Sequence, residues 1–175
     1  MAKNTALISI LCEDHPGLIA DVTGRLYDLG INLGDTNFAV LGGGAKLTLV
    51  AKLPSDISIP DVEEELRSIA VLRGADIEVA PFAYRETHDQ SAHITHRIEI
   101  TGDDSPGLIA RLSEALRPMG ANIVELNSES VHSANAARFL LRMAISVPKG
   151  KEAVCMATIA NTAGQMNLSC RWEQV

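Results

Sequence analysis

The sequence predicts an α+β protein made of two copies of one small unit, each with the order β-α-β-β-α-β. The segment Asp14–Ala20 recurs at Asp104–Ala110 with only its second residue changed, from His15 to Ser105. Each copy follows a short apolar run and precedes apolar residues at helical spacing. At this offset, 9 of the 19 positions from 14 to 32 are identical, which indicates duplication of one folding unit.

The composition narrows the class of protein. A length of 175 residues suits two small domains, and 46% hydrophobic with only 3% aromatic residues predicts aliphatic cores. The 15 basic residues are scattered among 22 acidic ones for a net charge of −7, which disfavours direct binding to nucleic acid. The three cysteines form no Cys-x-x-Cys pair, and we see no signal peptide or membrane span, so we expect a cytoplasmic protein.

The elements of the first unit can be placed in order from apolar periodicity and turn residues. We expect strands at 6–12, 31–41, 47–53 and 75–84, a hairpin turn at Gly42–Gly44, and helices that end at Gly30 and run from Pro60 to Gly74.

The second unit repeats this order. Ile98 and Ile100 belong to its first strand, and residues 139–147 alternate as a later strand after a longer hairpin around His132–Asn135. A weaker helix is expected at 150–163 and a last strand at 166–174.

The first helix of each unit begins at the repeated turn. Pro16 and Pro106 are expected at the first helical position, with His15 and Ser105 as N-caps. The apolar stripes are Leu18, Ile19, Val22, Leu26 and Leu29 in the first unit, and Leu108, Ile109, Leu112, Leu116 and Met119 in the second.

This order is the ferredoxin-like topology, in which four antiparallel strands carry two helices on one face. The other face of each sheet is expected to be partly apolar and to need a partner. We place the units at 1–84 and 96–175, with the polar, turn-rich residues 85–95 as the linker.

The repeated turn is also a candidate binding site for a carboxylate. A helix N-terminus offers free N–H groups and a partial positive charge, and Gly17 and Gly107 let another group approach the backbone. Asn32 and Asn122, near the far end of the first helix, could donate to and accept from an amino acid. The candidate ligand-binding residues are Asp14, His15, Gly17, Leu18, Ile19 and Asn32, with Asp104, Ser105, Gly107, Leu108, Ile109 and Asn122 in the second unit.

Two such units with Asp-x-Pro-Gly-Leu-Ile, a helix-ending glycine and an asparagine two residues later resemble tandem ACT domains. ACT domains are regulatory modules, many of which bind amino acids at interfaces between paired units. The layout without an enzyme domain resembles the glycine cleavage system transcriptional repressor family. That resemblance implies a homo-oligomeric, non-enzymatic protein that binds glycine or a similar small amino acid and acts through a protein partner such as a transcriptional activator.

Two other functions stay open from the residues alone. Paired sheets could bind a protein with no small-molecule ligand, or an enzyme could use His15 or Cys12, although no catalytic constellation accompanies them. His88, His93 and His96 could ligate zinc, but their spacing matches no closed site, so we predict no metal and no cofactor.

Overall fold

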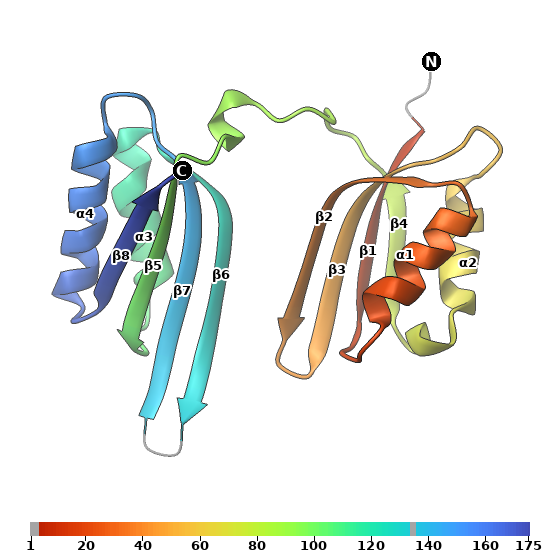
Figure 1. The fold of residues 1–175 in the computed structure, drawn as a ribbon, viewed down its shortest axis with the longest axis horizontal. Coiled ribbons are helices and arrows are strands. Elements are labelled where there is room, and N and C mark those ends of the chain that lie inside the picture. The colour runs from red at the N-terminus through yellow and green to blue at the C-terminus, as the bar shows by residue number, and fades with distance from the viewer. Residues whose placement is uncertain (1–3, 134–135) are drawn as a thin grey trace. The chain divides into compact units, whose positions relative to one another are not determined.

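A computed structural model describes residues 4–133 and 136–175, in two compact units, Met1–Tyr84 and Arg85–Val175 (Figure 1). Residues 85–95, which the sequence predicts as the linker, are counted with the second unit. There they contain one short 3₁₀ turn, Gln90–Ala92.

The first unit is one four-stranded antiparallel sheet with strand order β2-β3-β1-β4. Its elements are β1 (Thr5–Glu13), α1 (Leu18–Asp28), β2 (Asn32–Leu41), β3 (Gly44–Lys52), α2 (Ile59–Ser68) and β4 (Asp76–Pro81). The predicted hairpin turn is confirmed, since Gly42 and Gly43 alone join β2 to β3.

The second unit repeats the arrangement with strand order β6-β7-β5-β8. Its elements are β5 (His96–Asp103), α3 (Leu108–Leu116), β6 (Asn122–Ser133), β7 (Ala136–Ser146), α4 (Glu152–Gln165) and β8 (Ser169–Gln174). In the predicted hairpin His132–Asn135, the first two residues continue β6, and residues 134–135 lie outside the described part of the chain.

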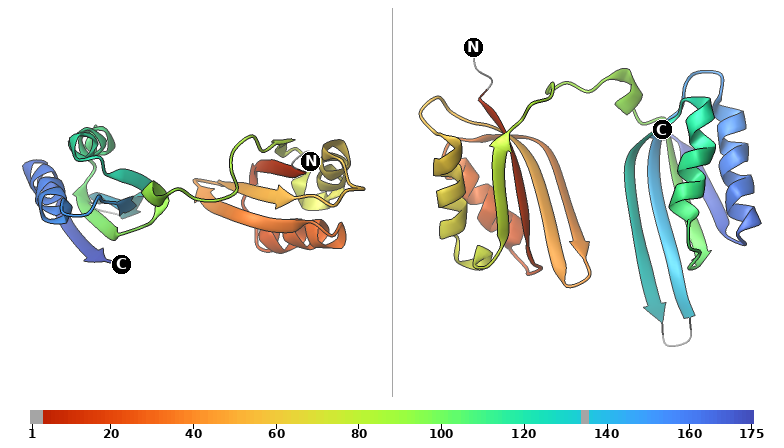
Figure 2. Two further views of the ribbon diagram at one scale, coloured as in Figure 1. Left: turned by 90° about the horizontal axis from the view of Figure 1, so that it is seen from above. Right: turned by 180° about the vertical axis from the view of Figure 1, so that it is seen from behind.

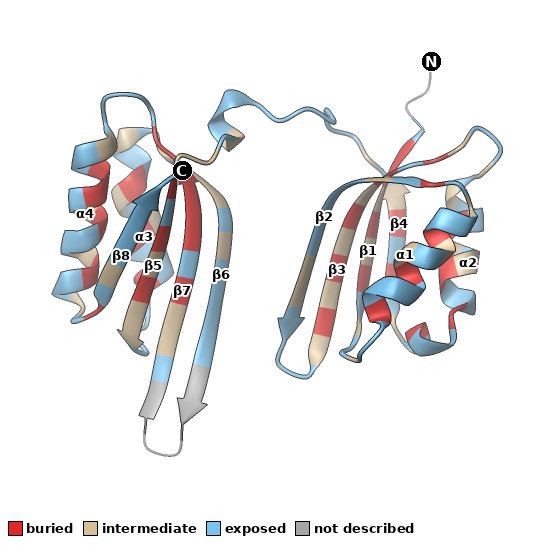
Figure 3. Ribbon diagram, viewed as in Figure 1, coloured by how far each residue is buried: buried red, intermediate tan, exposed pale blue. Residues whose placement is uncertain are grey.

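Both helices of each unit cover the same face of its sheet (Figure 2), which confirms the predicted α+β, ferredoxin-like fold. The buried residues line the helix-facing side of the central strands and the inner faces of the helices (Figure 3). In the first unit, Ile8 and Ile10 on β1 pack with Val22 and Leu26 on α1. Alternate strand residues and every third or fourth helix residue thus build one aliphatic core per unit.

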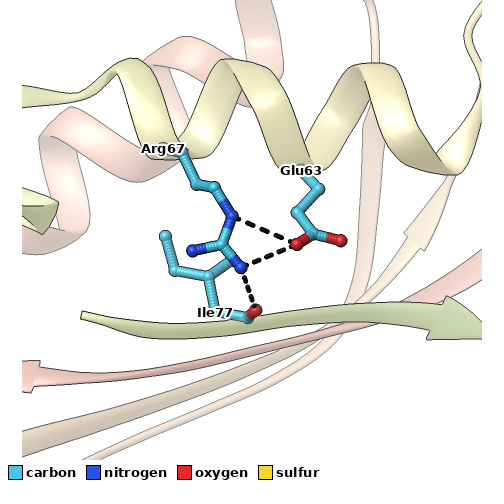
Figure 4. Close-up of polar contacts among 3 residues, drawn as sticks. All are labelled: Glu63, Arg67 and Ile77. Carbon is cyan, nitrogen blue, oxygen red and sulfur yellow. Dashed lines mark hydrogen bonds and ion pairs between the residues drawn. The ribbon is translucent and has the colours of Figure 1, made fainter. Parts of the chain in front are cut away.

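Helix α2 begins differently from α1. Ser58 caps it, with the Ser58 hydroxyl accepting from the Asp61 N–H and the Asp61 carboxylate accepting from the Ser58 N–H at 2.8 Å. Farther along, the Arg67 guanidinium donates to the Glu63 carboxylate at 2.7 Å and to the Ile77 carbonyl at 3.0 Å (Figure 4). Arg67 therefore ties this helix to the edge strand β4.

The open faces of the two sheets differ in how much charge they carry. In the first unit the open face includes the apolar residues Leu7, Val50 and the 44% exposed Leu11, as predicted. In the second unit the open face is also partly apolar, since Leu140 and Ala144 of β7 lie on it. Ion pairs lie among them, with Arg97 facing Glu125, Arg142 facing Glu99 and Glu129, and Arg171 facing Glu99. These charged pairs make the second face more compatible with water than the first.

Candidate functional site

The repeated motif forms a β-turn that precedes the helix, which corrects the expected helix start. Gly17 lies in the left-handed region with φ 94° and ψ −11°, and Gly107 matches it with 85° and 3°. The Leu18 N–H donates back to the His15 carbonyl at 3.4 Å. Proline at the second position and a left-handed glycine at the third are the signature of a type II turn.

The predicted N-caps are therefore wrong. His15 and Ser105 open the turn, Pro16 and Pro106 occupy its second position, and the helices begin at the residue after the glycine. No side chain caps either helix. The reason is geometric, because a left-handed glycine interrupts the helical backbone immediately after the proline.

This arrangement leaves backbone donors at the start of α1. The first acceptor inside the helix serves Asp21, whose N–H donates to the Gly17 carbonyl at 2.9 Å. The N–H groups of Ile19 and Ala20 have no acceptor in the part of the chain that the structure describes. The second unit repeats the pattern, with Arg111 donating to Gly107 at 2.9 Å. Each turn thus offers two free donors at the positive end of a helix, an arrangement that suits an anion.

In each turn, the two apolar candidate residues differ in their exposure to solvent. Leu18 and Leu108 are buried at 2% exposure, so their side chains belong to the cores and cannot reach a ligand. Ile19 and Ile109, expected within the apolar stripes, are 43% and 38% exposed. Each isoleucine is one residue off the buried stripe, and its side chain lies at the surface beside the free N–H groups.

Asp14 and His15 frame the first turn. Asp14 and Asp104 are both exposed, and the Asp14 N–H donates to Gly43 at 3.2 Å, which joins the turn to the β2–β3 hairpin. The His15 Nδ1 lies 3.0 Å from the Pro16 carbonyl, which only accepts, so Nδ1 is the donor. The opposite nitrogen, Nε2, is buried and has no partner among the described residues. A buried polar atom without a partner needs an explanation, and here the atom belongs to a residue of the candidate turn.

The asparagines lie away from the turns. Asn32 begins β2 and Asn122 begins β6, each after the far end of its unit's first helix. Because α1 has 11 residues and a helix rises about 1.5 Å per residue, the turn and Asn32 are on the order of 16 Å apart. One small amino acid cannot contact both within one unit. The structure therefore brings together the turn residues and sets the asparagine apart.

The residues considered for a nucleophilic or a zinc site do not come together in the described part of the chain. Burial raises the pKa of the Cys12 thiol and the nearby charge of Asp14 raises it further, so the reactive thiolate is disfavoured. His96 is buried, its Nδ1 lies 2.9 Å from the Thr95 hydroxyl, and its ring lies against Trp172. Within residues 4–133 and 136–175, no three His, Cys, Asp or Glu side chains are placed to hold a metal ion. No helix of those residues has the length and hydropathy needed to cross a bilayer.

One contact at the candidate site has no signal in the sequence. The Asn122 side chain donates to the Ser91 carbonyl at 2.8 Å, so the residues predicted as linker touch a predicted ligand-binding residue. A contact through a backbone carbonyl depends on how the segment folds back and not on which side chain it carries. The type II turn, by contrast, could have been predicted from Pro-Gly.

Comparisons with known proteins agree with this architecture. Two models of the ACT domain match the sequence, at residues 6–71 and 97–173. A crystal structure of an unknown protein from Galdieria sulphuraria has a TM-score of 0.75 at 20% identity and covers 98% of both chains. The structure of a protein assigned as a glycine cleavage system transcriptional repressor has a TM-score of 0.62 at 16% identity, covering 98% of this chain and 96% of that one. At these identities the likeness shows a shared fold, and no curated protein matches the sequence significantly.

Proposed function

This chain belongs to the ACT domain family, and we propose that it is a non-enzymatic sensor that binds glycine or another small amino acid at its two Asp-x-Pro-Gly turns. The observation that carries the proposal is the pair of unbonded N–H groups at the start of each first helix, beside an exposed glycine. A carboxylate is the anionic group that every amino acid presents. Charge-assisted bonds from helix-start N–H groups are among the stronger hydrogen bonds in proteins.

The ammonium group of the ligand needs acceptors. In the first unit Asp14 is exposed next to the turn, and the unpaired Nε2 of His15 can accept once the ring turns outward. Ser105 replaces His15 in the second unit, so the two turns offer different acceptors.

The distant asparagines enter the proposal through a second copy of the chain. Since one unit cannot place its turn and its asparagine on the same amino acid, a site that uses both takes the asparagine from another protomer. A homo-oligomer would supply it, and ligand binding would then alter the packing of the protomers. Such coupling requires that the ligand bind one packing state more tightly than the other.

The downstream partner is proposed to be a protein, and a DNA-binding transcriptional activator in particular. The net charge of −7 and the absence of a basic stripe in the sequence oppose direct DNA binding and favour an indirect role. The similar structure assigned as a glycine cleavage system transcriptional repressor supports the same reading. All three cysteines are free thiols, which suits the reducing conditions of the cytoplasm.

Calorimetry against a panel of amino acids at millimolar concentration tests the proposal. We expect glycine or a close analogue to bind and to raise the melting temperature, because a ligand at 100 times its dissociation constant stabilises the folded state by about 2.7 kcal/mol. Gly17→Val should weaken binding. Gly74→Val is the matched control, because Gly74 also has a positive φ, at 80°, and open space around it but lies away from the turns. Absence of both heat and thermal shift with every amino acid would overturn the sensor function.

A second candidate function is a protein interaction module with no small-molecule ligand. Exposed apolar side chains lie near the first turn, where Ile19 stands two residues after Gly17, Leu11 lies near the end of β1 and Leu41 is 60% exposed beside the hairpin turn. Capture of a partner that is equally strong with wild type, Gly17→Val and Asn32→Ala, with or without amino acids, would favour this function over sensing.

A further inference from the structure

The Asn122 side chain is engaged by the chain itself. Its amide nitrogen donates to the Ser91 carbonyl at 2.8 Å, across 31 residues of sequence. A carbonyl oxygen is the same kind of acceptor as one oxygen of a carboxylate. The backbone at Ser91 therefore gives Asn122 the contact that an amino-acid ligand would give it.

The segment that carries Ser91 is a hydrogen-bonded turn. Gln90–Ala92 forms a 3₁₀ turn in which the Ala92 N–H donates to Asp89 at 2.9 Å and the His93 N–H donates to Gln90 at 3.1 Å.

Thr95 anchors the following residues to the end of β7. Its N–H donates to the Ile145 carbonyl at 2.9 Å, and its hydroxyl accepts from the Val147 N–H at 2.9 Å. The turn, together with Asn122 and Lys149, lines an open hollow of about 920 Å³.

The first unit lacks this contact in the part of the chain that the structure describes. Asn32 is exposed, and its side chain has no hydrogen bond to any residue in 4–133 or 136–175. The two repeats therefore present their asparagines differently, one open and one occupied, although both asparagines begin an edge strand at the same position of the fold.

We propose that the turn Gln90–Ala92 is an internal competitor that occupies Asn122 and must leave before an amino acid can use this asparagine. The proposal rests on the proposed sensor function and adds regulation of the second site. The apparent affinity of a site is reduced by the fraction of time that it is open. Since the closure depends on about one hydrogen bond to a neutral side chain, we expect the second site to bind roughly two- to tenfold more weakly than it would without the turn.

Hydrogen exchange without any ligand tests the contact. The Ala92 and His93 amides report on the turn, because both donate within it. Asn122→Ala should speed their exchange by roughly two- to tenfold, the range expected for one lost hydrogen bond. Asn32→Ala removes the corresponding side chain of the other unit and should leave these amides unchanged. Equal exchange in the two variants would overturn the proposal, whatever the protein binds.

Calorimetry with glycine and with serine tests the competition. The variant Gln90→Gly/Ser91→Gly/Ala92→Gly loosens the turn, because glycine loses more conformational freedom on ordering. It should bind one class of site roughly two- to tenfold more tightly than wild type. Equal affinities in the two proteins would overturn the competition and leave the sensor function intact. Binding to neither protein would overturn the sensor function itself, and the ligand-free exchange data would separate that failure from loss of the contact.

Discussion

Gly17 and Gly24 lie seven residues apart on the same segment, yet opposite substitution effects are expected. Gly17 has φ 94°, whereas Gly24 is helical, and a Cβ at either would meet no atom within 4 Å. Only the backbone conformation differs. Gly17→Ala should lower the free energy of unfolding by about 1 kcal/mol, while Gly24→Ala should raise it by about 0.5–1 kcal/mol. Urea unfolding followed by circular dichroism measures both, and stabilisation by Gly17→Ala would contradict the left-handed assignment.

Gly102 is required for another reason, close packing. A Cβ there would lie 2.3 Å from Leu168 Cδ2 and 3.3 Å from Leu168 Cα, whereas the same position in the first repeat holds Cys12. Gly102→Ala should cost about 1–3 kcal/mol, because the Leu168 side chain must move aside and its Cα must shift by a few tenths of an ångström. Leu168→Ala removes the side-chain part of the clash at its own cost. In denaturant unfolding, the double variant should therefore lose less than the sum of the single losses, and strict additivity would contradict the contact.

At the scale of elements, helix α2 has side-chain hydrogen bonds that cap its N-terminus, and helix α1 has none. The hydrogen bonds from the Ser58 side chain and backbone lower the pKa of the Asp61 carboxyl. A lowered folded-state pKa stabilises above the ordinary value, and this stabilisation is lost as pH falls through the lowered one. Asp61→Asn should therefore flatten the fall in stability below about pH 4. Ser58→Ala should cost about 0.5–2 kcal/mol at neutral pH.

Urea unfolding between pH 7 and pH 2.5 measures this dependence. Glu64→Gln is the matched control, because it removes one negative charge from the same helix without touching the cap. If both variants showed the same pH profile, the acid sensitivity would come from net charge and not from the capping box.

Most elements could be predicted from sequence because their periodicity follows burial. Val62 and Leu66 on α2 lie in the core as their spacing predicts. The predicted start of α1 at Pro16 is two residues too early, because proline suits both a first helical turn and a β-turn, and the glycine that follows selects the β-turn. The ion pairs on the open face of β5–β8 could not be predicted, because they depend on the register that places Arg142 opposite Glu99.

At the scale of the whole molecule, the duplication is evident from sequence, and so is a difference between the two turns at His15 and Ser105, but the difference between the two asparagines is not. The repeat carries the same asparagine in both units, whereas the structure gives Asn122 an internal partner and leaves Asn32 without one among the described residues. That difference comes from residues 85–95, which carry Ser91 and are not part of the repeated sequence. Apolar periodicity and sequence repeats predict which residues each unit buries. They do not predict where a polar connecting segment folds back.

The inequality has a measurable consequence for the intact protein. Calorimetric titration with an amino acid that binds should resolve two classes of site, the weaker one by roughly two- to tenfold. Asn32→Ala should remove the tighter class and Asn122→Ala the weaker one, because each variant takes the asparagine of one repeat. The reverse assignment would show that the turn at Gln90–Ala92 assists binding by positioning Asn122. A single class in wild type, lost equally in both variants, would mean that the repeats act as one symmetrical site despite their different surroundings.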